Sequence, residues 1–312
     1  MTFLKKLGKT LLVLKSLEES ENKPSLVKYW NLYSKRKNMS KFRLVIESGR
    51  LERNYWKDLW HYKELFAFIA WRDILVRYKQ TVIGIAWSVI RPLLTMIVFT
   101  IIFGKVAKLP SDGVPYPILV FAAMLPWQFF SNTLSEGGNS LIINSNMITK
   151  VYFPRIIIPT TSMIVSLIDF IISFAIMCVL LIFYLYAPSW KIIFFPGFLG
   201  LAILTSLGIT FGISALNVKY RDFRYVVPFI IQFGLYISPV GFSSSVIPEK
   251  WRLLYSLNPM VGVIDGFRWS ITGDNSIIYW PGFFLSLGVA ILLFIIGIKY
   301  FRTTEREFAD VI

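Results

Sequence analysis

Long apolar blocks separated by short polar stretches are the dominant pattern of this chain. A membrane-spanning helix needs about 20 predominantly apolar residues. Six blocks meet that length, at about residues 82–103, 117–135, 156–186, 192–216, 223–242 and 281–301. The pattern predicts an all-α integral membrane protein with six transmembrane helices. The third block is long for one span, so we expect it to be tilted or to project beyond the bilayer.

Two further apolar segments are too short or too polar to span. Residues 63–80 place four apolar side chains on one helical stripe and charged ones on the other face, which is typical of an amphipathic helix in the headgroup plane. The stripe consists of Phe68, Trp71, Leu75 and Tyr78. Residues 243–280 contain short apolar pieces broken by Pro and Gly. They predict re-entrant helices between spans five and six, whose backbone must be buried in protein or line a wet cavity.

The distribution of basic residues predicts the orientation. With the amino terminus inside, the inner segments carry 26 Lys and Arg residues, against six in the outer loops. Basic residues concentrate on the cytoplasmic side of membrane proteins, so both termini are expected there. Residues 1–60 form a predicted cytoplasmic extension. The net charge of +15 then reflects topology and attraction to anionic lipid, and we expect no nucleic-acid partner.

Composition argues against several kinds of chemistry. Charged residues make up 16% of the chain and apolar ones 55%, which is unlike a soluble globular domain. A single cysteine, Cys178, and a single histidine, His61, exclude an internal disulfide and disfavour a metal site. The sequence Gly8-Lys9-Thr10 lacks the first glycine of a P-loop. We therefore expect no catalytic or metal-binding residues and no bound cofactor, and any work needs energy from elsewhere.

Two charged residues lie inside predicted spans. Arg91 is in the first span and Asp169 in the third. Ionisable side chains are costly in hydrocarbon, so they mark candidate functional sites that face the bundle interior or a water-filled path. They could equally pair with each other, or Arg91 could extend to a hydrated face for structural reasons alone. The residues themselves leave these alternatives open.

Three stretches of sequence resemble a known family. Residues 72–93, Arg-Asp-Ile-Leu-Val-Arg-Tyr-Lys-Gln-Thr-Val-Ile-Gly-Ile-Ala-Trp-Ser-Val-Ile-Arg-Pro-Leu, are similar to the entry signature of ABC-2 type polysaccharide exporter permeases. These are the transmembrane subunits that export O-antigen, capsule and teichoic acid chains. Residues 144–155 and 217–223, with Asn258-Pro259-Met260, resemble further parts of the same family. Together they cover about residues 60–300 in order, whereas residues 1–58 have no recognised counterpart.

The resemblance implies an assembly and a cargo. It implies a homodimer bound to two copies of a separate ATPase subunit, which would hold ATP and Mg²⁺, with a translocation path between the two six-helix bundles. The cargo would be an undecaprenyl-diphosphate-type lipid-linked glycan in a bacterial inner or plasma membrane. The chain itself would be a transport subunit and not an enzyme.

The resemblance also implies roles for individual segments and residues. Segment 63–80 would be the interface helix at the membrane surface, and the pieces within 245–272 would cap the path on the outer side. A helix around 140–150 would couple to the ATPase through Asn144, Asn146, Met147 and Lys150. Aromatic side chains would line the path and slide along sugar faces: Trp87, Trp127, Phe130 and Tyr236. Basic side chains would receive the lipid diphosphate as charge-assisted donors: Arg72, Arg77, Lys79, Lys150 and Arg155.

Three other functions remain as alternatives. An ABC-2 exporter of lipid or drug-like cargo is disfavoured by the aromatic spans and by the Arg-Tyr-Lys-Gln-Thr stretch at 77–81. A membrane glycosyltransferase predicts turnover by the chain alone and a charged cluster in a large loop. A passive channel or scaffold predicts no ATPase partner.

Overall fold

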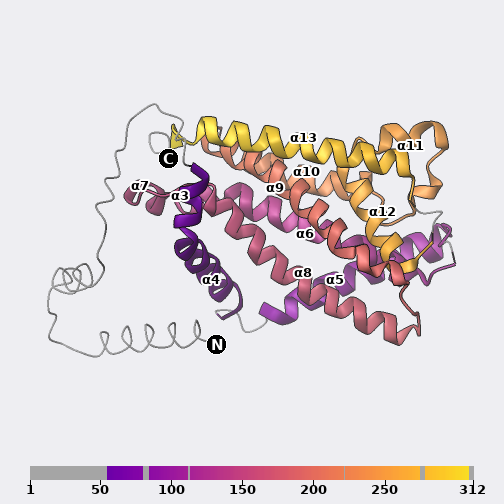
Figure 1. The fold of residues 1–312 in the computed structure, drawn as a ribbon. Helices are drawn as coiled ribbons and strands as arrows, with labels where there is room; N and C mark the ends of the chain where they lie inside the picture. Colours follow the sequence, from indigo (N-terminus) through magenta and orange to yellow (C-terminus); the bar gives the residue numbers. More distant parts are fainter. Residues whose placement is uncertain (1–54, 80–83, 112, 221, 275–277, 309–312) are drawn as a thin grey trace. The chain divides into compact units, whose positions relative to one another are not determined.

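The structure is a computed structural model that describes residues 55–79, 84–111, 113–220, 222–274 and 278–308. The predicted extension at 1–60 lies almost entirely outside the described residues. Every regular element in the described part of the chain is a helix (Figure 1). This agrees with the predicted all-α class.

Five helical segments of the described chain are long and apolar enough to cross a membrane. They are Ser88–Val106, Tyr116–Ile143, Ile157–Phe183, Trp190–Lys219 and Trp280–Thr304. The first combines α5 (Gly84–Phe99) with a π-helical continuation, η1 (Thr100–Val106). The fourth combines η2 (Trp190–Phe194) with α9 (Phe195–Lys219). The other three are single helices: α6 (Tyr116–Ile143), α8 (Ile157–Phe183) and α13 (Trp280–Thr304). The chain is thus a multi-pass membrane protein. At 27 residues, α8 is about 40 Å long against about 30 Å of hydrocarbon, in keeping with the expected long third block.

The fifth predicted span is shorter than expected. Helix α10 covers Phe223–Ile237, where the sequence predicts a span to residue 242. Its end has a local cause, because Ser238 precedes Pro239 and a residue before proline is driven out of the helical region. Ser238 is accordingly extended, with φ −81° and ψ 152°. A sixth crossing through this segment stays a prediction.

Helix α6 is longer than its predicted span, which ends at residue 135. The extra turns contain Gly137 and Gly138, and they pack against α9. A Cβ on Gly137 would lie 2.4 Å from Cγ2 of Thr210, and Asn217 donates its amide to the Gly138 carbonyl at 2.9 Å. Positions that read as a polar loop are therefore a close contact between two helices.

Helices α9 and α13 also approach each other through glycine. A Cβ on Gly297 would lie 2.0 Å from the Gly208 carbonyl oxygen. Only the absence of a side chain permits this separation, which is the usual reason for small residues at membrane helix contacts.

Short helices gather at one end of the bundle, called the α12 end below. They are η3 (Ser244–Val246), α11 (Glu249–Tyr255) and α12 (Pro259–Thr272). Asn258 caps α12 by accepting from the Met260 amide at 3.0 Å, and Gly273 ends it at φ +78°. The apolar pieces within 243–280 are thus helices; that they re-enter the membrane stays a prediction.

A fully buried arginine anchors α12 to its neighbours. The Arg268 guanidinium donates to three backbone carbonyls, those of Leu119 at 3.1 Å, Phe242 at 2.7 Å and Val240 at 3.0 Å. These carbonyls belong to the start of α6 and to the segment that follows α10. One side chain therefore joins the two segments and gives the Phe242 and Val240 carbonyls a donor.

Other short helices lie at the opposite end of the bundle, called the α7 end below (Figure 1). They are α3 (Tyr55–His61), α4 (Lys63–Lys79), which packs on α8, and α7 (Ser145–Lys150). Glu305, which follows α13, accepts from the Tyr55 hydroxyl at 3.0 Å and from the Arg155 amide at 2.6 Å. This carboxylate joins α3, the start of α8 and the end of α13.

Candidate functional site

A cluster of charged side chains joins α4 to α6 and α8. Arg77 of α4 pairs with Glu136 of α6 and, at 2.6 Å, with Asp169 of α8. The Tyr78 hydroxyl also donates to Asp169, and Asn132 of α6 lies 3.4 Å from the same carboxylate. Arg77, Glu136 and Asp169 are named the ionic cluster below.

The ionic cluster identifies the ion-pair partner of Asp169. The sequence left open a pair between Arg91 and Asp169, and the structure pairs Asp169 with Arg77 instead. Asp169 lies twelve residues into α8, about 18 Å along its axis. The end of α4 is therefore bound to the middle of α8, inside the helix bundle. A helix that only rested on the membrane surface would not make this contact.

A second contact ties α4 to the junction of α6 and α7. Arg72 donates to Asp73 at 2.7 Å and to the Asn144 side-chain oxygen at 2.9 Å. Asn144 also donates to the Ser140 carbonyl at 2.9 Å, within the last turn of α6. The Arg72–Asn144 hydrogen bond thus connects α4 directly to the residue that precedes α7.

The five basic residues expected to receive a diphosphate differ in their availability. Arg77 and Arg72 are engaged as described. Arg155 is engaged too, since its guanidinium donates to the Glu305 carbonyl and lies 5.9 Å from the Phe308 ring centroid. Lys79 and Lys150 are exposed. Of the five residues, the two lysines therefore have the charged groups that are most accessible to a ligand.

The predicted coupling residues lie in and around α7. Asn144 precedes the helix, Asn146 and Lys150 are exposed on it, and Met147 is half-buried against the core. Ile148 is buried and holds the short helix to the bundle. The helix therefore presents a polar face outward, as a docking element would require.

A cavity of about 440 Å³ opens beside the ionic cluster. Helices α5, α6, α8 and α10 line it, and its wall includes Arg77, Arg91 and Asp169 together with several amides and hydroxyls. Arg91 is exposed, and its guanidinium has no hydrogen-bond or ion-pair partner among the described residues. Arg91 and Asp169 thus share one cavity without contacting each other.

The four aromatic residues predicted to line a path are placed differently. Trp127 is buried and lines this cavity, while Phe130 is buried beside it with ring centroids 5.4 Å apart. Tyr236 of α10 is exposed. Trp87 belongs to α5, but its side chain lies outside the described residues. The structure brings two of them together and leaves their predicted role untested.

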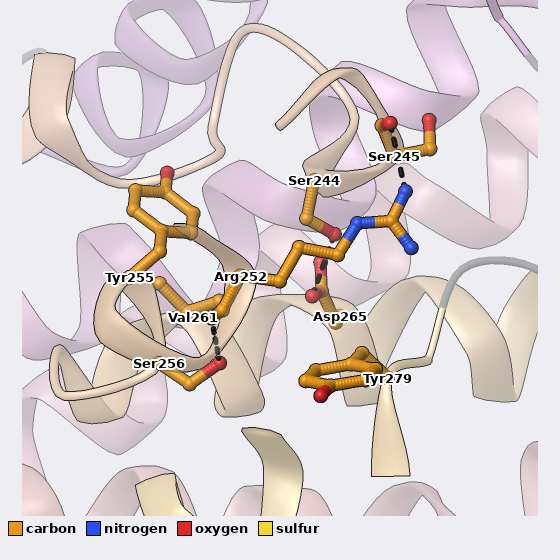
Figure 2. Close-up of a pocket in the computed structure, with 8 residues that line it drawn as sticks. All are labelled: Ser244, Ser245, Arg252, Tyr255, Ser256, Val261, Asp265 and Tyr279. Atoms are coloured by element: carbon orange, nitrogen blue, oxygen red, sulfur yellow. Dashed lines mark hydrogen bonds between the residues drawn. The ribbon is translucent and has the colours of Figure 1, made fainter. Parts of the chain in front are cut away.

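A buried carboxyl group lies in a smaller pocket at the α12 end (Figure 2). Asp265 accepts from the Ser244 hydroxyl at 2.6 Å, and its other oxygen has no partner in the described chain. The guanidinium of Arg252 reaches over the same pocket to the Ser245 carbonyl. Burial raises the pKa of Asp265 to about 7, against the lowering effects of Ser244 and Arg268. The pocket, of about 10 Å³, has room for one water molecule.

Sequence reasoning missed Glu136 and Arg268 as important residues. Glu136 falls one position beyond the predicted end of span two, and Arg268 lies within residues 243–280, where the sequence predicts re-entrant helices. A usable signal for Glu136 was present, because Asn132 and Glu136 are four apart and share one helix face if the helix continues. Nothing local marks Arg268, whose carbonyl partners are distant in the sequence.

Comparison with known proteins agrees with this architecture. The profile of the ABC-2 type transporter family matches residues 64–272. The chain is 26% identical over 257 residues to the O-antigen export system permease protein RfbA of Myxococcus xanthus, covering 81% of this chain and 97% of that protein. Two proteins of the same name from Klebsiella pneumoniae are 26% identical over 256 and 250 residues, each covering 80% of this chain and 95% of the relative.

These matches confirm the resemblance drawn from the three sequence stretches. The family profile covers 209 of the 312 residues and includes α4, the ionic cluster, the cavity, α7 and α12. The protein therefore belongs to the ABC-2 type transporter family.

Proposed function

We propose that the chain is the transmembrane subunit of an ATP-driven exporter that moves a lipid-linked polysaccharide across the bacterial inner or plasma membrane. The observation that carries the proposal is the similarity to O-antigen export permeases over 95–97% of their length. A separate ATPase subunit supplies the energy and holds ATP and Mg²⁺. Two copies of the chain form the path, and both termini face the cytoplasm.

The contacts at the α7 end support a route for coupling. The outward face of α7 docks on the ATPase, and the Arg72–Asn144 hydrogen bond passes its movement to α4. The ionic cluster then links α4 to the wall of the cavity. ATP hydrolysis outside the membrane thereby changes the arrangement of helices inside it.

The first test is co-purification with the ATPase. The tagged chain is expressed with its neighbouring genes, extracted in mild detergent and assayed for a stoichiometric partner and vanadate-sensitive ATP hydrolysis. Lys150→Glu combined with Asn146→Lys changes only exposed positions of α7 and should release the ATPase. Lys250→Glu makes the same charge reversal at an exposed position of α11 and should retain it. A chain that purifies alone and supports no hydrolysis contradicts the proposal.

The second test concerns cargo. A strain without its exporter, but with its glycan synthesis intact, should regain surface polysaccharide when the chain and its ATPase are supplied together. Restoration of drug resistance or of phospholipid export in place of polysaccharide would favour the lipid or drug exporter instead. Glycosyl transfer by the chain alone would favour an enzyme.

A further inference from the structure

The cavity beside the ionic cluster is unusual for the interior of a membrane protein because so much of its wall is polar. Amide side chains come from α6 and α10, and hydroxyls from α5, α6 and α8. They include Gln128, Asn132, Gln232, Thr95 and Ser173. An apolar cavity can stay empty, whereas buried polar groups need partners from water or a ligand. At about 440 Å³ the cavity is within the size range of small-ligand sites.

The charged groups around the cavity are not paired one to one, because Arg77 is shared by two carboxylates. Arg77, Arg91 and Asp169 line the cavity, and Glu136 holds Arg77 without being part of the lining. Asp169 is occupied by Arg77 at 2.6 Å and by the Tyr78 hydroxyl. Arg91 is left with its donors unpaired among the described residues. Arg91 is thus the one guanidinium of this wall that has no carboxylate partner among the described residues.

The chemistry of Arg91 selects the kind of ligand. A guanidinium presents a planar fork of donors that matches the oxygens of a phosphate in bidentate geometry. An unpaired arginine within a membrane span is costly, so an anion that reaches it is favoured over hydrocarbon. Trp127 lies on the same wall, and the amides offer donors and acceptors for the hydroxyls of a headgroup.

We propose that this cavity is a binding site for a lipid-borne phosphate, with Arg91 as the phosphate contact and Trp127 and the α6 amides beside the hydroxyl-bearing headgroup that the phosphate carries. The inference rests on the proposed function and deepens it. Here the phosphate is bound by an arginine inside the first span, because Arg72, Arg77 and Arg155 are already bonded to other groups of the protein. The phosphate source is either the lipid-linked cargo or an anionic phospholipid.

The test measures lipid retention by the full chain with its ATPase, in nanodiscs of phosphatidylcholine. In one arm the discs are doped with a polyprenyl diphosphate sugar, and in the other with phosphatidylglycerol; bound lipid is quantified by native mass spectrometry. Arg91→Gln should weaken retention about tenfold to a hundredfold, since one charge-assisted contact is lost. Arg91→Lys keeps the charge without the fork and should be intermediate. Lys105→Gln removes one positive charge at the exposed end of the same span and should change nothing.

The outcomes separate this inference from the function on which it rests. Loss confined to the polyprenyl diphosphate sugar assigns the site to cargo, and equal loss in both arms assigns it to membrane phospholipid. Undiminished retention of both lipids by Arg91→Gln overturns the site. Co-purification with the ATPase shows that the variant is folded, and it remains intact even if the site is wrong. If the unmodified chain captures no ATPase, the proposed function has failed instead.

Discussion

Replacing Asp169 with asparagine tests whether the ionic cluster holds α4 against the bundle. The change preserves the size of the side chain and removes its charge. It also presents an amide to a site where Arg77, Tyr78 and Asn132 supply donors. The contacts of Asp169 are therefore weakened together.

The expected cost follows from the burial of the pair. Removing one partner of a fully buried ion pair costs about 3–5 kcal/mol, but here Arg77 keeps Glu136 and its side chain is 29% exposed. A hydrogen bond to a charged group contributes about 1.5–3 kcal/mol. We expect the free energy for opening α4 away from α8 to fall by about 2 kcal/mol, which is roughly a 30-fold change in the opening equilibrium.

Hydrogen exchange of the α4 amides is the appropriate assay, because it reports local opening without global unfolding. Amides of residues 66–76 should exchange about 30-fold faster in Asp169→Asn. Asp73→Asn is the matched control, since it makes the same chemical change on α4 itself. Asp73 contacts the adjacent Arg72, whose side chain is 39% exposed, and a screened surface pair is worth less than about 1 kcal/mol.

A further variant removes the shared cation of the ionic cluster. Arg77→Gln removes the cation shared by Glu136 and Asp169, so it should speed exchange more than Asp169→Asn does. Equal exchange rates in Asp169→Asn and Asp73→Asn would refute the idea that the ionic cluster fastens α4.

Three other perturbations test the packing and the buried charges. Gly297→Ala should lower the thermal midpoint in detergent, at a cost of about 1–3 kcal/mol from overpacking against Gly208, whereas Gly288→Ala, with open space around it, should be neutral. Arg268→Met should leave the Phe242 and Val240 carbonyls without donors, at about 1–3 kcal/mol each, and expose the chain near residues 240–274 to protease; an intact, resistant protein would contradict this. Because the pKa of Asp265 is raised to about 7, the folded state binds the extra proton, so stability should fall as pH rises from about 4 to 7, by up to about 1.4 kcal/mol per unit. Asp265→Asn should make the difference in thermal stability between pH 5.5 and pH 7.5 smaller.

The apolar blocks were sufficient to predict most of the fold. Hydrophobicity over 20 residues is a local property, so α5, α8, α9 and α13 could be located without knowing their neighbours. The end of α6 could not, because Gly137 and Gly138 read as loop residues until their contact with α9 is known. The early end of α10 had a local signal in Ser238-Pro239, which a hydropathy window does not weigh.

Side-chain partnerships were much less predictable. Arg91 and Asp169 could be selected as costly charges from sequence alone, yet their partners depend on how helices far apart in the chain come together. Arg77 is 92 residues from Asp169 in the sequence, and the family resemblance implies a lipid diphosphate as its partner. The family resemblance implies a helix around residues 140–150. The structure has a helix at Ser145–Lys150, whereas residues 140–143 belong to α6.

The bonds made by Glu305 have a consequence for the order in which the protein can mature. Tyr55 and the Arg155 amide are synthesised long before Glu305, which is 250 and 150 residues further along. During translation neither group can bond to Glu305 until the last long helix, α13, has left the ribosome. A nascent chain halted before α13 therefore lacks both hydrogen bonds, and the contact between α3 and the start of α8 through Glu305 can form only after synthesis of the last long helix.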